Sequence, residues 1–169
     1  MKLIAAVDKF NGIGKNDGSL LFRIPEDLQR FKSMTIGNTV IVGRKTLDSF
    51  PGGKPLPDRR CIVLSRQSNH PDNGAEYCGS IKELSELLSG IDEEVFVIGG
   101  GEIYRTLMPL CDTMYITRID ADGGGEIFFP PMGDLWQLTE KSEKREYDGI
   151  SYWFETYKRN IIFPSCLIR

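Results

Sequence analysis

The pattern of apolar and polar residues along the chain predicts strands that alternate with helices. Short, uninterrupted apolar runs are typical of strands that are buried on both faces of a sheet. Runs of this kind occur at 2–7, 38–43, 60–65, 94–100 and 113–120, and a further short strand is expected near Tyr77.

Apolar residues at helical spacing recur between these runs. A helix is predicted from 25 to about 34, with Pro25 at the first helical position, where its missing N–H is not needed. A second begins at Ser80, which matches a capping box with Glu83. Two shorter helices are expected at 44–50 and 101–109.

The end of the chain has a different pattern. Two long strands at 136–147 and 150–159 flank an Asp-Gly turn, which predicts an antiparallel hairpin. Strands and helices that alternate and then close with a hairpin indicate a single α/β domain with a mostly parallel sheet and an antiparallel edge. The Gly- and Asn-rich segment 8–20 can only be a long loop, and such a loop in a compact domain is usually functional.

Length and charge narrow the class of protein. The chain has 169 residues and 40% hydrophobic composition, enough for one domain with one core. We expect this domain at 1–159 and a tail of unassigned role at 160–169. A net charge of -3 and a pI near 5.3 make a nucleic-acid partner unexpected. No apolar run is long enough to cross a bilayer, so we expect a cytoplasmic protein without membrane contact.

Cysteine and histidine give no sign of a metal site. The single histidine, His70, lies in a turn-rich stretch, so a histidine ligand set or histidine base is not expected. The cysteines lack Cys-x-x-Cys spacing, and three lie in or beside predicted strands. We expect reduced thiols at Cys61, Cys78, Cys111 and Cys166.

Two adjacent acids at the start of the first helix have different surroundings. Both could serve simply as first-turn acids, where negative charge interacts favourably with the helix dipole. Helical spacing places Asp27 within the apolar stripe of Leu28 and Phe31, whereas Glu26 points to the far side. A carboxylate among apolar side chains is costly unless a ligand or donor pairs with it. Asp27 is therefore the functional candidate.

Glycines and cations follow several predicted strands. Backbone N–H groups of "VIGGGEIY" could receive a phosphate, although the G-x-G-x-x-G spacing of a Rossmann fold is absent. Arg44, Lys45 and Thr46 follow one strand, and Ser65 with Arg66 follows the next. Neighbouring basic strand exits favour a phosphorylated cofactor, although a solvated helix start alone would have the same pattern.

In this order, the motifs resemble dihydrofolate reductase over residues 2 to 158. No single motif is specific, but eight in register are: "LIAAVD", "NGIGKNDGSLLF", "IPEDLQRFK", "VGRKTLDSF", "PLPDRR", "IVLSR", "VIGGGEIY" and "YITRIDADGGGEIFFP". The resemblance implies a central eight-stranded twisted sheet with about four flanking helices. It also implies the NADPH-dependent reduction of 7,8-dihydrofolate to tetrahydrofolate in a monomer, which antifolates such as trimethoprim or methotrexate would inhibit.

By this resemblance, Asp27 is the acid that hydrogen-bonds the 2-amino group and nitrogen 3 of the pterin. It would orient the ring and favour protonation at nitrogen 5, while NADPH delivers hydride to carbon 6. Thr117 is similar to the threonine that bonds this carboxylate, and Arg59 to the arginine that binds the substrate's α-carboxylate. The substrate site would further include Ile4, Ala6, Leu28, Phe31, Phe50, Leu56, Ile98 and Tyr104.

The resemblance likewise implies a cofactor site and a lid. Gly99 and Gly100 would be joined by a cis peptide. Glu126 would steady the lid, which extra glycines nearby are expected to loosen. The cofactor site would comprise Ala6, Ile13, Gly14, Asn16, Leu20, Gly43, Arg44, Lys45, Thr46, Leu64, Ser65, Arg66, Ile98, Gly99, Gly100, Gly101, Glu102, Ile103 and Tyr104.

The chain departs from the family pattern at two places. Leu21 and Phe22 stand where many bacterial relatives have Pro-Trp, so the indole N–H that would hold a water beside the acid is missing. Glu102 stands where some relatives have a basic residue near the cofactor phosphate. Two rivals stay open: a riboflavin-pathway reductase of the same fold, and a nucleotide-binding module without catalysis. Asp27, Phe31 and Arg59 argue against the first.

Overall fold

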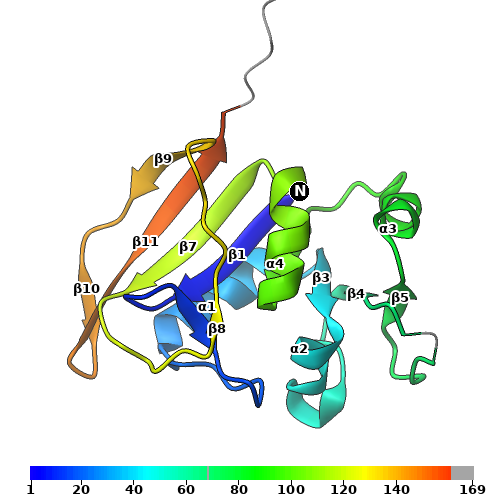
Figure 1. The fold of residues 1–169 in the computed structure, drawn as a ribbon, viewed down its shortest axis with the longest axis horizontal. Helices are drawn as coiled ribbons and strands as arrows, with labels where there is room; N and C mark the ends of the chain where they lie inside the picture. The colour runs from blue at the N-terminus through cyan, green and yellow to red at the C-terminus, as the bar shows by residue number, and fades with distance from the viewer. Residues whose placement is uncertain (68, 161–169) are drawn as a thin grey trace, which may run out of the picture.

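A single mixed sheet runs through the molecule in the computed structural model, which describes residues 1–67 and 69–160 (Figure 1). The strand order is β10-β11-β7-β1-β6-β3-β4-β5, with parallel pairing from β7 to β5. The strands are β1 Lys2–Val7, β3 Thr39–Gly43, β4 Arg60–Leu64, β5 Glu76–Cys78, β6 Val95–Gly99, β7 Thr113–Ile119, β9 Trp136–Lys141, β10 Arg145–Tyr147 and β11 Ile150–Arg159.

The antiparallel edge is the predicted hairpin with one interruption. β11 pairs with β7 on one side and with both β9 and β10 on the other. The sheet therefore has nine strands where the sequence predicts eight, because the single strand expected at 136–147 is divided into β9 and β10. Asp148 and Gly149 have φ of 52° and 75°, as a tight two-residue hairpin turn requires.

Four helices cover the sheet as predicted: α1 Pro25–Thr35, α2 Arg44–Asp48, α3 Ile81–Leu88 and α4 Gly101–Leu107, with 3-10 turns at Pro51–Gly53 and Met108–Leu110. Pro25 opens α1, and the Ser80 side chain accepts a 3.2 Å hydrogen bond from the Glu83 backbone N–H at the start of α3. Figure 1 shows α1 and α4 on opposite sides of the sheet.

The core consists of two large layers, because alternate residues of a strand point to opposite faces. Leu3 and Ala5 of β1 pack in the layer that contains Leu84 of α3 and Leu107 of α4. Ile4 packs in the other layer, which contains residues of β3, β4, β6 and α2 and receives Phe31 and Met34 of α1. The sheet therefore holds α4 on one face and α1 on the other.

The long loop after β1 contains a strand that the sequence pattern did not reveal. β2, Gly12–Gly14, pairs with β8, Ile127–Phe128, in a separate two-stranded sheet. None of the described helices has the length and apolarity needed to span a membrane. Residues 161–169, which include most of the predicted tail and Cys166, lie outside the described residues.

The described cysteines and the single histidine lie in different surroundings. Cys61, Cys78 and Cys111 are buried and free, and burial raises the thiol pKa to about 11 for Cys61. The His70 ring stacks on Tyr77 with centroids 4.1 Å apart. Among the described residues no group of His, Cys, Asp and Glu side chains could hold a metal ion.

Candidate active site

Asp27 and Thr117 form the polar centre of the site. Asp27 is in the first turn of α1, and Thr117 is on β7, 1% exposed. The Thr117 hydroxyl donates a 2.5 Å hydrogen bond to Oδ1 of Asp27. In the sheet, Thr117 lies between Ala6 of β1 and Phe154 of β11. Residues far apart in sequence thus meet under the start of α1.

The environment of Asp27 perturbs its ionisation. Burial raises the pKa of this carboxyl, while the Thr117 hydrogen bond and the charge of Arg30 lower it, and burial prevails. A carboxyl whose pKa is raised in a pocket is a typical site of proton chemistry.

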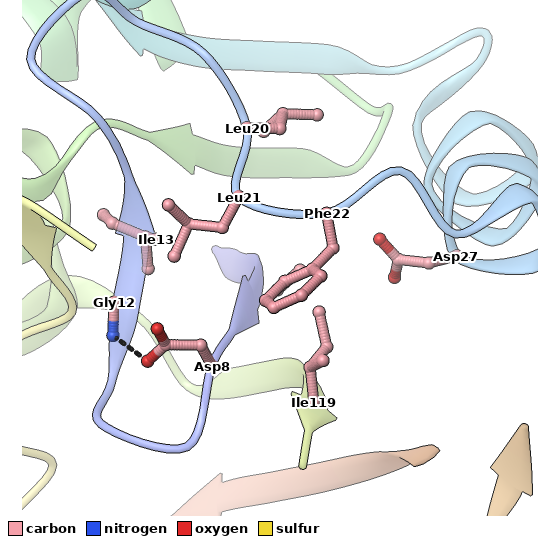
Figure 2. A pocket seen from close by; sticks show the side chains of 9 residues that line it. Asp8, Gly12, Ile13, Leu20, Leu21, Phe22, Asp27 and Ile119 are labelled. Atoms are coloured by element: carbon pink, nitrogen blue, oxygen red, sulfur yellow. Dashed lines mark hydrogen bonds between the residues drawn. The ribbon is translucent and has the colours of Figure 1, made fainter. Parts of the chain in front are cut away.

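A pocket opens beside the Asp27 carboxyl (Figure 2). It brings together four residues that the resemblance places in the site: Ala6, Ile13, Leu20 and Asp27. Figure 2 shows the ring of Phe22 between Leu21 and Asp27, at the place where the family pattern would have an indole. The apolar side chains around Asp27 account for the burial that raises its pKa. The pocket also contains Asp8, Gly12, Leu21 and Ile119, which the sequence analysis did not assign.

Hydrogen bonds hold loop 8–20, the lid that the resemblance implies, at its start and in its middle. Asp8, 1% exposed, accepts hydrogen bonds from the backbone N–H groups of Phe10, Gly12 and Gly123. Glu126 accepts a 2.8 Å hydrogen bond from the Asn16 backbone N–H. The lid is therefore tied to the loop between β7 and β8, and Figure 2 shows the Asp8 bond to Gly12 at the pocket wall.

Glycines in the loop between β7 and β8 allow it to pack closely against loop 8–20. A Cβ on Gly123 would lie 2.7 Å from the Leu21 Cβ, and one on Gly125 would lie 2.7 Å from the Gly12 Cα. These glycines bring the loop against the lid, and the contact between Glu126 and Asn16, which we expected them to loosen, is present.

The residues assigned to the rest of the substrate site extend from Asp27 along α1. Arg59 is oriented by a 2.8 Å hydrogen bond from Nε to Thr35 and lies over the Phe31 ring at 5.8 Å. Phe31, Phe50 and Ile98 are partly buried against the same core layer as Ile4. Leu56 is half-buried, whereas Leu28 is 38% exposed and so less buried than a core stripe implies.

Tyr104 joins α4 to the substrate side of the site. Its hydroxyl donates a 2.8 Å hydrogen bond to the Ile4 carbonyl, and burial raises its pKa. The peptide between Gly99 and Gly100 is cis, as the resemblance implies. A Cβ on Gly100 would lie 2.9 Å from the Thr46 hydroxyl, so the exits of β6 and β3 approach closely.

The remaining residues assigned to the cofactor lie at the carboxyl ends of the strands. Gly43 and Leu64 are register partners on β3 and β4, so Arg44 and Ser65 follow at adjacent strand exits, as predicted. Lys45 and Arg66 are exposed. Elsewhere, a Cβ on Gly101 would lie 2.9 Å from Ile127 of β8 and 3.8 Å from Ile13, and one on Gly43 would lie 2.7 Å from Ile103. Gly14 is bonded through its carbonyl to Glu126, and Glu102 pairs with Arg105 at 3.1 Å.

Two residues of α1 have contacts that the sequence pattern did not reveal. The Glu26 carboxylate, expected to serve only the helix start, binds Tyr152 and Arg145 of the outer strands. Arg30 packs its guanidinium against Tyr115 and Phe154. These contact partners are 85 or more positions away in the sequence, so the local sequence pattern around α1 does not indicate them.

Comparisons with known proteins agree with this geometry. A family model described as dihydrofolate reductase matches residues 1–159. The dihydrofolate reductase of Neisseria meningitidis serogroup A is 41% identical over 159 residues, covering 93% of this chain and 96% of that protein. The enzyme of Mycobacterium leprae is 38% identical over 153 residues, covering 88% and 92%.

A solved structure shows the same fold. Dihydrofolate reductase from Enterococcus faecalis, complexed with NADP(H) and RAB-propyl, superposes with a TM-score of 0.85 at 34% identity. The match covers 94% of this chain and 95% of that one.

The mixed sheet, the half-buried carboxyl of Asp27 and the pocket beside it define an α/β oxidoreductase. The chain belongs to the dihydrofolate reductase family. Its activity is the NADPH-dependent reduction of 7,8-dihydrofolate to 5,6,7,8-tetrahydrofolate, a reaction of one-carbon metabolism. The family match favours this activity over a riboflavin-pathway reductase and over a module without catalysis.

Proposed function

We propose that this chain reduces dihydrofolate at the Asp27 pocket, with Asp27 as its one catalytic acid. The observation that carries the proposal is the 2.5 Å hydrogen bond from Thr117, which fixes the carboxyl in the pocket. Asp27 would hold the 2-amino group and nitrogen 3 of the pterin and favour protonation at nitrogen 5. Phe22 has no N–H to hold a water there, so the proton would enter without that donor.

The substrate's outer part would lie along α1 and the segment before β4. Phe31 and Phe50 offer apolar faces, and the guanidinium of Arg59 is held in place by Thr35. A planar guanidinium fixed in this way suits a carboxylate in a bidentate pair. We assign to Arg59 the α-carboxylate of the substrate's glutamate tail.

The strand exits fit a phosphorylated nicotinamide cofactor. Arg44 and Arg66 offer cations at neighbouring exits, and the Thr46 hydroxyl faces glycine backbone at Gly100. When bound, NADPH supplies the hydride. Tyr104 and the lid residue Ile13 would enclose its nicotinamide end, and the lid would exclude water from the pocket.

The experiment is the loss of NADPH absorbance with dihydrofolate for the parent protein and for Asp27→Asn. Loss of a positioned acid should lower turnover by at least about a hundredfold. Glu86→Gln, which removes one negative charge from an exposed position on α3, is the matched control and should stay within about twofold of the parent. Turnover that is absent in the parent, or undiminished in Asp27→Asn, refutes the proposal.

Two further assignments belong to the same proposal. We expect the pocket to bind antifolates such as trimethoprim and methotrexate in competition with dihydrofolate. We also expect a cytoplasmic monomer. Competition kinetics test the antifolate assignment, sedimentation of the full chain tests the oligomeric state, and cell fractionation tests the location.

A further inference from the structure

Arg30 lies three residues after Asp27 on α1, and its guanidinium is buried against rings rather than against an acid. Its central carbon is 4.6 Å from the Phe154 ring centre and 5.5 Å from that of Tyr115. Its Nη1 is buried and, among the residues that the structure describes, has no hydrogen-bond partner. Burying a cationic N–H without a partner costs free energy, so the placement needs an explanation.

The rings that hold Arg30 belong to the strands that hold Asp27. Tyr115 and Thr117 are two residues apart on β7, so their side chains share a face of the sheet. Phe154 of β11 is the register partner of Thr117. β7 and β11 therefore contact the cation and the carboxyl, both of α1, from the same face of the sheet.

Ionisable groups surround Asp27 from several elements, and most have partners of their own. Glu26 is bound to Tyr152 and Arg145, and the Tyr104 hydroxyl is bound to the Ile4 carbonyl. Asp8, across the pocket, is bound to three backbone N–H groups. Asp8 shares the pocket with Asp27, and Arg30, Tyr104 and Tyr152 interact with it electrostatically.

Arg30 is the cation in this set. Burial raises the pKa of Asp27, and the Thr117 bond and the Arg30 charge lower it. Arg30 forms none of the ion pairs found between described side chains, so no other acid neutralises its charge. Because aromatic rings rather than a carboxylate hold the guanidinium, its positive charge is not compensated and acts on Asp27.

We propose that Arg30 is a positioning residue that acts electrostatically on Asp27 and so sets the pH range in which the enzyme turns over. The inference rests on the proposed role of Asp27. A positive charge nearby favours the deprotonated form of any acid in the pocket, whether the Asp27 carboxyl or a protonated pterin nitrogen. Removing that charge must therefore move the pH profile upward, whichever of the two groups titrates.

The test is the pH profile of single-turnover hydride transfer for the parent, Arg30→Met and Arg30→Lys. Methionine keeps an apolar stem for the two rings but removes the charge, and lysine keeps the charge. Lys32→Met is the matched control, because it removes one positive charge from an exposed position on the same helix. Carbon-13 NMR titration of the Asp27 carboxyl in the same proteins gives a second readout without catalysis.

We expect the midpoint to move upward in Arg30→Met and to stay near the parent value in Arg30→Lys and Lys32→Met. A structural role for Arg30 predicts instead a lower rate or stability with an unmoved midpoint, which would overturn the inference. If Arg30→Met does not fold, Arg30→Gln takes its place as the variant without the charge. The inference is then overturned if the midpoint of the pH profile moves as far in Arg30→Lys as in Arg30→Gln. Full activity of Asp27→Asn would refute the proposed function itself, which separates the two failures.

Discussion

Tyr152 of β11 donates a 2.5 Å hydrogen bond to Glu26, the residue directly before Asp27, and Arg145 of β10 binds the same carboxylate. Two acids that are adjacent in sequence therefore have separate partners. Glu26 ties the start of α1 to the outer strands, and Asp27 bonds Thr117 on β7. The first turn of the helix is fixed from two sides, which leaves the Asp27 carboxyl little freedom to turn away from the pocket.

The contact between Glu26 and Tyr152 should be measurable as a coupling energy. Tyr152→Phe keeps the buried ring, and removing a hydrogen bond to a charged group should lower the free energy of unfolding by about 1.5 kcal/mol. A double-mutant cycle with Glu26→Ala, which removes the acceptor, isolates the pair by urea unfolding. Tyr147→Phe, at an exposed position on β10, is the control. Additive effects of the two changes would show that the contact contributes nothing.

Asp8 should matter for stability and for the lid together. Asp8→Ala leaves three backbone N–H groups without their acceptor, and we expect a loss of at least about 2 kcal/mol in the free energy of unfolding. Because two of these donors lie in the lid segment, the Michaelis constants should rise as well. Asp17→Ala, which removes an exposed turn bond to Ser19, serves as the control and should change stability by less than about 0.5 kcal/mol. Equal losses in both variants would contradict the assignment.

Glu126 should affect the chemical step without affecting the fold. Glu126→Ala removes the acceptor of the Asn16 backbone N–H, and a looser lid should slow hydride transfer several-fold. Glu126→Gln retains an acceptor oxygen and should remain close to the parent. Single-turnover fluorescence measures the step, and thermal unfolding checks that stability changes little. The idea fails if alanine and glutamine behave alike.

The raised pKa of Asp27 makes stability depend on pH in a predictable sense. The folded protein holds this proton at pH values where the unfolded chain, with its carboxyl near the ordinary pKa of 3.8, has released it. The contribution of this group to stability therefore falls as pH rises through that interval. Asp27→Asn should be more stable than the parent at neutral pH, and the difference should shrink on acidification below the ordinary pKa. Urea unfolding across the pH range measures it, and a constant difference would contradict the prediction.

Arg59→Ala should weaken the binding of dihydrofolate far more than it slows the reaction. Loss of a bidentate pair with the substrate's carboxylate should raise its Michaelis constant by about tenfold or more, with turnover little changed. Thr35→Val removes only the side chain that orients Arg59 and should have a smaller effect of the same kind. An unchanged Michaelis constant for dihydrofolate in Arg59→Ala would refute this role.

Much of the fold could be predicted because its strands and helices have local patterns. β3 and β6 are buried on both faces and appear in the sequence as unbroken apolar runs. Pro25 and Ser80 mark the starts of α1 and α3 through chemistry within one turn. Asp27 could be singled out because a carboxylate within an apolar stripe conflicts with that pattern.

The features that escaped prediction depend on contacts between distant segments. β2 and β8 are three and two residues long, too short for a periodic signal. Asp8 is bound in part to Gly123, and Arg30 rests on Tyr115 and Phe154, so their roles arise only once the sheet has formed. The break between β9 and β10 is similarly invisible in an alternating stretch of charged and polar residues.

That break has a consequence for how the molecule meets other copies of itself. An open sheet edge offers unpaired N–H and C=O groups to any passing strand. Here one edge is β5, three residues long, and the other is divided between the short β10 and the largely polar β9. Neither edge presents a long, flat, apolar row that could template another chain. The interruption thus protects a sheet with a long final strand from edge-to-edge aggregation.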